Sequence, residues 1–297
     1  MRIEQIGRRT IAQTDLPGVR RLEWHAAAAP DGVFCRLPLP DLVVILNVAS
    51  PGWFRLRAVE TWQPLPAASI RGLCTTPSDG RDPSSGRIGY VSLVIEPWSS
   101  PIYLGQPASV FAGRIENAAV VWPDAPQLLD GVACAASVAD RLAQVCTFLT
   151  QRFARHCWRA TERADRRLWG QLHAGDSVSV VASTLGVSTR RVHQRCLQSF
   201  GVSARHCTQL SRFGRLLERV AATLDGPVPW TQEFADQSHA TRTFRRFAAT
   251  TPGQYRASRR GVAQPYSIVG HHGSWRDECA GAAAPWLNDG WHTRDAS

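Results

Sequence analysis

The chain has 297 residues, of which 44% are hydrophobic and 20% are charged. A chain of this length and composition forms one or two domains with buried cores, which excludes a largely disordered protein. The longest apolar run, residues 42–49, is too short to cross a bilayer, and residues 1–17 lack the apolar stretch of a secretory signal. We therefore expect a cytoplasmic protein.

The net charge of +10 is unevenly distributed along the chain. Residues 160–261 contain 16 Arg and 7 acidic residues, a net of +9, whereas residues 1–159 carry +3 and residues 262–297 carry −2. Every basic residue is Arg, whose planar guanidinium forms bidentate pairs with phosphates and with guanine edges. A concentrated basic segment is typical of a polyanion-binding domain, and an ordinary solvated surface is the alternative.

The first 100 residues predict short β-strands. Residues 42–46 form a β-branched run typical of a buried strand, residues 54–59 alternate apolar and charged side chains, and residues 90–95 are a third candidate. Clusters of Pro, Gly, Ser and Asp, such as residues 77–80, separate these segments. The pattern favours a small barrel or a sandwich.

The front segment contains several aromatic side chains and few metal ligands. Trp53, Phe54, Trp62 and Trp98 are candidates for lining a ligand pocket, and a place in the hydrophobic core is the favoured alternative for each. His25 is the only His before residue 156. A His-rich metal centre is therefore not expected, and we expect no metal or other cofactor.

Beyond about residue 107 the periodicity becomes helical. Residues 139–153 place apolar side chains at helical spacing along one face. This change of class and the rise in Arg after it predict a front domain at residues 1–158 and a helical domain at residues 159–261. Residues 262–297 have no period and are expected to form a poorly ordered tail.

Residues 177–201 have the pattern of a helix-turn-helix unit. A short helix is followed by Gly186, which suits the positive φ of a tight turn, and by Ser188, a natural N-cap for a second helix. Apolar residues recur every four positions in that second helix and face inward. These inward residues are Val192, Cys196 and Phe200. The residues left outside are Arg190, Arg191, Gln194, Arg195 and Gln198. Such a face suits a major-groove reader, and a helical hairpin with a solvated face is the alternative.

A second unit of this kind is predicted at residues 234–248. Asp236 or Ser238 can cap its helix, and Pro252 is placed near the start of a closing helix. An apolar stripe from Leu210 to Leu224 lies between the two units. The stripe predicts a long linker helix that holds both units.

These residues resemble a known family. Residues 186–188, the Arg-rich helix after them and residues 200–203 (FGVS) look like the first unit of AraC/XylS-type regulators. The later motifs FADQSH at 234–239, FRRF at 244–247 and TPGQYR at 251–256 are similar to the second unit of that family. The order and spacing of the later motifs are the specific part of the likeness, which covers about 80 residues.

The front segment resembles, more faintly, the cupin-like sensor domain that precedes these helices in part of the family. The likeness is carried by LPDL at residues 39–42 and YLGQPA at residues 103–108. The resemblance implies an α+β multidomain chain: a mostly β, cupin-like barrel over residues 1–158, then an all-α double helix-turn-helix domain over residues 159–261. It implies a sequence-specific transcription factor that binds double-stranded DNA and acts either as an activator or as a repressor. A small organic effector, RNA polymerase and a second copy of the chain are further implied partners, and no membrane is.

Position in the family's motif assigns the residues that contact DNA. In the first helix the base-facing residues are Arg190, His193 and Gln194, and in the second they are Gln237, Ser238 and Arg242. The residues placed for phosphates are Thr189, Arg191 and Thr241. Arg suits the O6 and N7 atoms of guanine, and Gln suits N6 and N7 of adenine.

The chain departs from the family just before the second unit. Only residues 227–233 separate the linker helix from Phe234, and Glu233 stands where the family has Gly. The supporting helix of the second unit is therefore expected to span at most one turn. We expect sequence specificity to depend mainly on the first unit.

A rival interpretation is a thiol-reactive DNA-binding protein, either a redox sensor or an alkyl-transfer enzyme. Such a protein needs a Cys activated by a nearby His or by a metal. The adjacent pairs in this chain are His156 with Cys157 and His206 with Cys207. Neighbours on a helix diverge by about 100°, which does not favour such a pairing. The common nucleophile, phosphate-loop and zinc-protease motifs are also missing from the sequence, so we expect no enzymatic activity.

Overall fold

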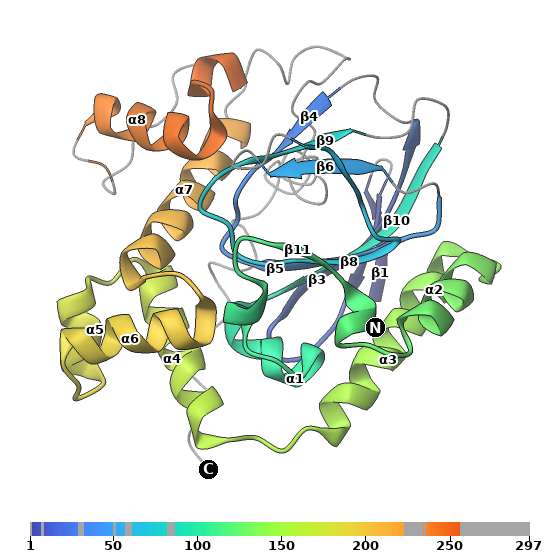
Figure 1. The fold of residues 1–297 in the computed structure, drawn as a ribbon, viewed down its shortest axis with the longest axis horizontal. Helices are drawn as coiled ribbons and strands as arrows, with labels where there is room; N and C mark the ends of the chain where they lie inside the picture. Colours follow the sequence, from blue (N-terminus) through green and yellow to red (C-terminus); the bar gives the residue numbers. More distant parts are fainter. Residues whose placement is uncertain are drawn as a thin grey trace.

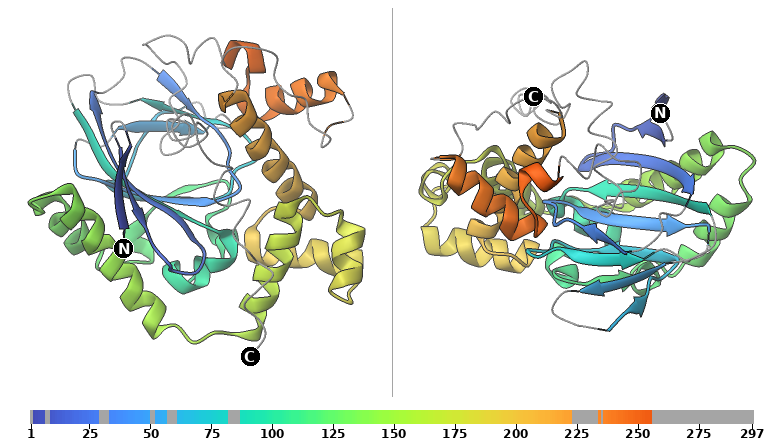
Figure 2. Two further views of the ribbon diagram at one scale, coloured as in Figure 1. Left: turned by 180° about the vertical axis from the view of Figure 1, so that it is seen from behind. Right: turned by 90° about the horizontal axis from the view of Figure 1, so that it is seen from above.

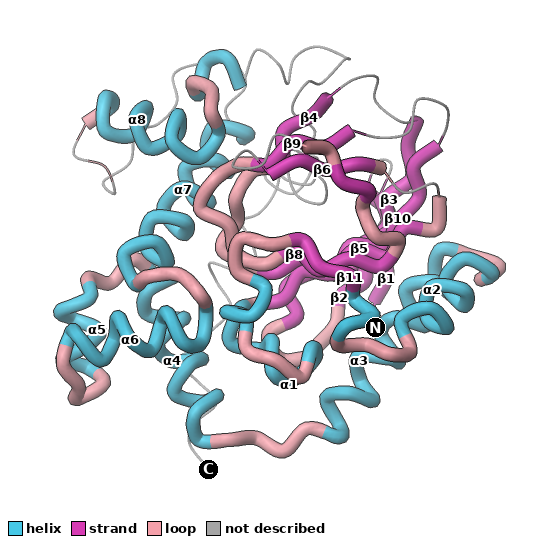
Figure 3. Tube along the Cα trace, in the orientation of Figure 1, coloured by secondary structure: helices cyan, strands magenta, loops and turns pink. Residues whose placement is uncertain are grey.

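The computed structural model describes residues 2–6, 9–28, 33–49, 52–56, 61–81, 87–222, 234 and 236–255. Strands occupy the front of the chain and helices the rear (Figures 1 and 3). The predicted class, a mostly β front followed by an all-helical rear, is confirmed.

Seven strands form an antiparallel sheet in the order β1-β2-β3-β10-β5-β8-β11. Their bounds are Arg2–Ile6 (β1), Arg9–Gln13 (β2), Val19–Ala28 (β3), Leu42–Asn47 (β5), Ala68–Arg71 (β8), Arg87–Ile95 (β10) and Ile115–Asn117 (β11). The predicted buried run, residues 42–46, forms all of β5 except its last residue, and these residues are buried. The predicted strand at residues 90–95 lies within β10, which pairs with β3 on one side and with β5 on the other.

Four further strands form a second antiparallel sheet, in the order β4-β9-β6-β7, which faces the first (Figure 1). Their bounds are Val33–Arg36 (β4), Trp53–Leu56 (β6), Gln63–Pro64 (β7) and Ser78–Arg81 (β9). β6 includes residues 54–56 of the predicted strand 54–59. Residues 57–59 lie outside the described part of the chain. Among the described strands no pairing joins the two sheets, because the edge strands of each pair on one side only. The expected closed, cupin-like barrel is therefore not confirmed, and the described strands form two separate sheets.

The four candidate pocket aromatics form two pairs with different surroundings. Trp98 and Phe54 belong to the core, with exposed fractions of 2% and 4%. Trp53 lies on the opposite face of β6 from Phe54, where the guanidinium of Arg81 is 5.9 Å from its ring and 5.1 Å from the ring of Trp62. Two of the aromatics are therefore buried and the other two stack with Arg, and their role in a ligand pocket stays a prediction.

Short helical elements join the sheets to the rear helices. They are η1 Pro97–Ser99, α1 Ser100–Leu104, η2 Ala108–Phe111, η3 Ala118–Val120, α2 Ala125–Cys134 and α3 Val138–Arg155. α3 contacts β3, α1 and α2 and buries Leu142, Val145 and Leu149, on the face that the sequence predicts (Figure 2). An extended connection follows and ends where α4 begins, at Ala160. The predicted boundary at residue 158 lies in this connection.

The rear consists of α4 Ala160–Ala174, α5 Val178–Thr184, α6 Thr189–Phe200, α7 Ala204–Ala222 and α8 Gln237–Ala248. α4 packs against α7 and also contacts η1 of the front part. The predicted tail, residues 262–297, lies outside the described residues. Among the described helices, none has the length and apolar character to cross a membrane.

The C-terminal end of α6 docks on η2. The Ser109 hydroxyl donates a hydrogen bond to the backbone oxygen of Gln198 over 2.6 Å. Gly201 caps α6 with a φ of 73°, and a Cβ at this position would lie 2.4 Å from the Cβ of Ala112 and 2.8 Å from the Cα of Ser109. Only glycine combines this backbone conformation with so close an approach.

Replacing Gly201 by Ala should separate the cost of the backbone from the cost of the contact. Gly186 has a similar φ of 65° and nothing within 4 Å of its virtual Cβ, so Gly186→Ala reports the left-handed backbone alone, about 1–2 kcal/mol. Gly201→Ala adds overpacking against Ala112, and we expect a further loss of about 1–3 kcal/mol in the free energy of unfolding. Urea denaturation of the two variants measures the difference. Equal losses in the two variants would show that η2 moves away from the added methyl group without a cost in stability.

Candidate nucleic-acid interface

The first helix-turn-helix unit consists of α5, a turn at Gly186 and α6. Ser188 caps α6, and its hydroxyl accepts a hydrogen bond from the backbone N–H of Arg191 at 3.2 Å. The inward residues Val192, Cys196 and Phe200 are buried, as the four-residue spacing predicts. The turn, the cap and the buried stripe together determine which side of α6 faces outward.

Apart from Leu197, the outward side of α6 is polar and basic. The predicted contact residues of this helix are all exposed: Thr189, Arg190, Arg191, His193 and Gln194. No acidic residue lies on α6. The face therefore presents positive charge and hydrogen-bonding groups together, and the individual base and phosphate roles of these residues stay predictions.

Arg195 differs from the sequence-based expectation, which left it on the outside. Its guanidinium binds the carboxylate of Asp165 on α4, with Nε–Oδ1 at 2.5 Å and Nη2–Oδ2 at 2.9 Å, and Nη2 also donates to the backbone oxygen of Thr161. Burial raises the pKa of Asp165 against the opposing effect of Arg195. A bidentate pair fixes both distance and orientation, so Arg195 holds α6 at a set rotation relative to α4.

The second unit presents a similar face on α8. The carboxylate of Asp236 caps this helix by accepting the N–H of His239 at 2.6 Å, which decides between the two caps that the sequence allows. Ala240, Phe244 and Phe247 are buried, as predicted. The predicted contact residues Gln237, Ser238 and Arg242 are exposed, and Thr241 is half-buried. Their contacts with DNA stay predictions.

Aromatic packing on the linker helix α7 holds the second unit in place. The ring of Phe213 lies 5.6 Å from that of Phe244 and 5.1 Å from that of Phe247. Phe244 also contacts Tyr255, which belongs to a helical turn at residues 252–255. The expected one-turn supporting helix, residues 227–233, lies outside the described part of the chain. In the described part, α7 and the closing turn support α8.

A polar contact adds to this attachment. Arg246 on α8 lies with Nη2 at 3.2 Å from Nε2 of His206 on α7, and the other ring nitrogen of His206 lies 3.0 Å from the Ser203 hydroxyl. Burial lowers the pKa of His206, and the charges of Arg246 and Arg205 lower it further. A neutral His206 accepts a hydrogen bond from Arg246, which ties α8 to α7.

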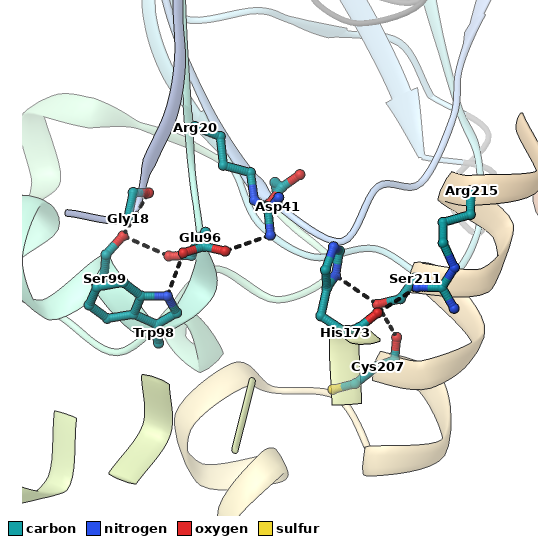
Figure 4. A network of polar contacts seen from close by, with 10 residues as sticks. All are labelled: Gly18, Arg20, Asp41, Glu96, Trp98, Ser99, His173, Cys207, Ser211 and Arg215. Carbon is teal, nitrogen blue, oxygen red and sulfur yellow. Dashed lines mark hydrogen bonds and ion pairs between the residues drawn. The ribbon is translucent and has the colours of Figure 1, made fainter. Parts of the chain in front are cut away.

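Two groups of polar contacts that the sequence did not predict lie beside each other, one in the front part and one on the rear helices (Figure 4). In β3, Arg20 is the extra residue of a β-bulge, since Val94 pairs with Arg21 and Ile95 with Val19. Its guanidinium reaches Asp41 at 2.9 Å and Glu96 at 2.5 Å. Glu96 also accepts the indole N–H of Trp98 at 2.6 Å. Burial raises the pKa of Asp41 to about 6, against the opposing charge of Arg20, and Glu96 adds to the rise.

The second group lies on α4 and α7. The Ser211 hydroxyl donates to the backbone oxygen of Cys207 and lies 2.9 Å from Nδ1 of His173, and Arg215 donates to the backbone oxygen of His173. Burial keeps the pKa of His173 well below its ordinary value, and the charges of Arg20 and Arg215 lower it further. Because Arg20 belongs to the front sheet, the two groups adjoin at the boundary between the β and helical parts.

An open groove of about 720 Å³ lies between α2 and α3. Leu128 and Phe148 supply its apolar part, while Asp124, Asp140 and Gln144 supply polar groups. Within the described residues, no three His, Cys, Asp or Glu side chains lie together in a way that would hold a metal ion. The groove is remote in the fold from α5 and α6, which lie on the other side of the molecule (Figure 1).

Comparisons with known proteins give structural neighbours but no sequence relatives. No family model matches the chain, and no curated protein matches it. An apo variant of ToxT from Vibrio cholerae is 12% identical, covers 79% of this chain and 97% of its own, and has a TM-score of 0.48. ToxT with an unsaturated fatty acid bound is 10% identical, covers 79% and 94%, and has a TM-score of 0.46. The AraC-like transcriptional activator CuxR is 17% identical, covers 71% and 80%, and has a TM-score of 0.29.

The charge state of Asp41 should make stability depend on pH. Its folded pKa of about 6 lies above the ordinary 3.8, so the folded chain binds the proton more tightly. The resulting stabilisation is present at low pH and is lost as pH rises through 6. Relative to Asp41→Asn, which stays uncharged, the wild type should gain about 1 kcal/mol in unfolding free energy between pH 7 and pH 5.

The comparison with Asp41→Asn cancels the titration of His173, which is present in both proteins. Urea denaturation at the two pH values measures the change. A difference between the two proteins that does not vary with pH would contradict the assignment.

Proposed function

We propose that this chain is a sequence-specific transcription regulator of the AraC/XylS type, an activator, that reads duplex DNA with α6 and α8. The observation that carries the proposal is the pair of capped helices that bury one side in the rear core and expose a polar, Arg-containing side. Two such helices suit two major-groove contacts on one duplex. The family motifs around residues 186–203 and 234–256 favour the same function.

Electrostatics supports this proposal. Residues 160–261 carry a net charge of +9, and the exposed sides of α6 and α8 contain Arg190, Arg191, Arg242 and Arg245. DNA binding is driven in large part by the release of counterions from phosphates, and a basic surface of this kind provides it. The proposal places the protein in the cytoplasm, with RNA polymerase and a second copy of the chain as further partners.

The thiol-reactive alternative is not favoured by the geometry around the two cysteines. Cys207 is fully buried, and a hydrogen bond with Cys196 together with burial raises its pKa well above the ordinary value. Cys157 is exposed, but the ring of its neighbour His156 binds the carboxylate of Glu162 at 2.7 Å. A reactive thiolate needs a lowered pKa and access, so these observations support a regulator without enzymatic activity.

The first test is DNA binding by the full chain. A duplex selected from a random pool provides the cognate site, and log affinity is measured against log salt. Arg190→Ala should lose about 1–3 kcal/mol on the selected site and little on a scrambled duplex, because base contacts carry the specificity. Arg191→Ala should weaken both duplexes alike and reduce the salt slope by about 1, as a phosphate contact does.

Arg114→Ala is the matched control, because Arg114 is an exposed arginine of the front part with 68% of its side chain accessible. It should leave both affinities unchanged. Affinity that stays flat with salt would rule out the nucleic-acid function.

The second test concerns an effector. We propose that the front part binds a small organic molecule without metal, since His25 is the only His before residue 156. A thermal-shift screen of small organic acids and aromatic compounds should find stabilisers whose effect persists with a chelator present. If divalent metals alone raise the melting temperature, the metal-free effector is wrong.

A further inference from the structure

One apolar side chain lies on the outer side of the first recognition helix. Leu197 is 53% exposed, whereas the other large apolar residues of α6, Val192 and Phe200, are buried. Its neighbours on the outer side are polar or charged. More than half of the surface of Leu197 is therefore open to a partner on this side of α6.

Helical geometry places Leu197 in the middle of the proposed base-reading face. Each residue advances the direction of the side chain by about 100°. Measured from Arg190, His193 points to about −60°, Gln194 to about +40° and Leu197 to about −20°. Leu197 therefore points between the predicted base readers and extends their face by one turn.

The rise of the helix sets the distance between the two readers. At about 1.5 Å per residue, Leu197 lies about 10.5 Å along the axis from Arg190. Base pairs are about 3.4 Å apart, so this offset corresponds to about three base-pair steps. A side chain at this position meets a base pair that Arg190 does not reach.

The chemistry of the side chain selects the group that it can recognise. Base edges in the major groove present hydrogen-bond donors and acceptors at nearly every position, and the exception is the C5-methyl group of thymine. A leucine side chain forms no hydrogen bond and gains from burying a methyl group. Resting on the proposed function, we infer that Leu197 is a specificity residue that contacts a thymine methyl about three base pairs from the base read by Arg190.

The second recognition helix has a different residue at the same place. Leu197 follows its cap Ser188 by nine positions, and Arg245 follows the cap Asp236 by nine positions. Arg245 is also exposed. The apolar reader is therefore specific to α6, and the corresponding position of α8 is suited to a phosphate or to guanine.

A structural role is the rival explanation for Leu197. The next residue, Gln198, accepts the hydrogen bond from Ser109 of η2. If Leu197 serves this contact, its removal lowers the stability of the whole chain and weakens binding to every duplex alike. If Leu197 reads a methyl group, its removal abolishes the preference for that methyl and leaves the fold intact.

The test uses the full chain and the duplex selected in the first DNA-binding experiment. Each thymine of the site is replaced in turn by deoxyuridine, which removes the methyl group alone. At one position the wild type should lose about fourfold in affinity, the value of one buried methyl group. Leu197→Ala should bind the thymine and deoxyuridine duplexes equally at that position. Val180→Ala, which removes an apolar side chain of 51% exposure from α5, should keep the wild-type preference.

The outcomes separate the inference from the proposed function. Failure to select any site, or affinity that does not fall with salt, would refute the DNA-binding function itself. A selected site at which Leu197→Ala keeps the full preference for thymine would refute the role of Leu197 alone. An equal loss on all duplexes, together with a lower melting temperature of Leu197→Ala, would assign Leu197 to the contact with η2 and overturn the inference.

Discussion

The arrangement of the rear helices depends on the one-sided burial of α6 and α8. Val192, Cys196 and Phe200 fix the inner side of α6, and Phe244 and Phe247 pack on Phe213 of α7 to fix that of α8. Once these sides are buried, the direction of every outer side chain follows from the helical repeat. The proposed interface is thus a consequence of core packing, and substitutions in this core should disturb recognition without touching DNA.

α6 makes contacts outside its own helix-turn-helix unit, both with α4 and with the front part. Arg195 ties α6 to Asp165 of α4, and Gly201 brings its C-terminal end against Ala112 near η2 of the front part. The polar groups around Arg20 and around His173 adjoin at the boundary between the same two parts. A change in the front part therefore has a direct physical path to α6 that does not run through the connection between α3 and α4.

Features that depend on short-range sequence patterns were predicted correctly. Contacts between residues far apart in the chain were not predicted. The caps Ser188 and Asp236, the turn at Gly186 and the buried strand β5 all follow from short-range spacing, and all are confirmed. The helical repeat places Arg195 on the outer side of α6. Its ion pair was missed because the partner, Asp165, lies 30 positions away in the chain. The closed barrel is not confirmed, and pairing between strands is decided by segments far apart in the chain. The Arg20 bulge has no sequence signal, although Glu96, a lone acid after an apolar run, hints at a buried partner.

The two recognition helices share a framework and differ in chemistry, and this difference has a consequence for the proposed DNA site. Equivalent positions after the two caps hold Arg190 and Ser238, Gln194 and Arg242, and Leu197 and Arg245. Two such faces prefer different base sequences, because bidentate, single and apolar contacts select different groups in the major groove. Under the proposed function, one chain therefore reads an asymmetric sequence, and the chain itself sets the direction of binding. A regulator of this kind needs no partner copy to distinguish one direction along the duplex from the other.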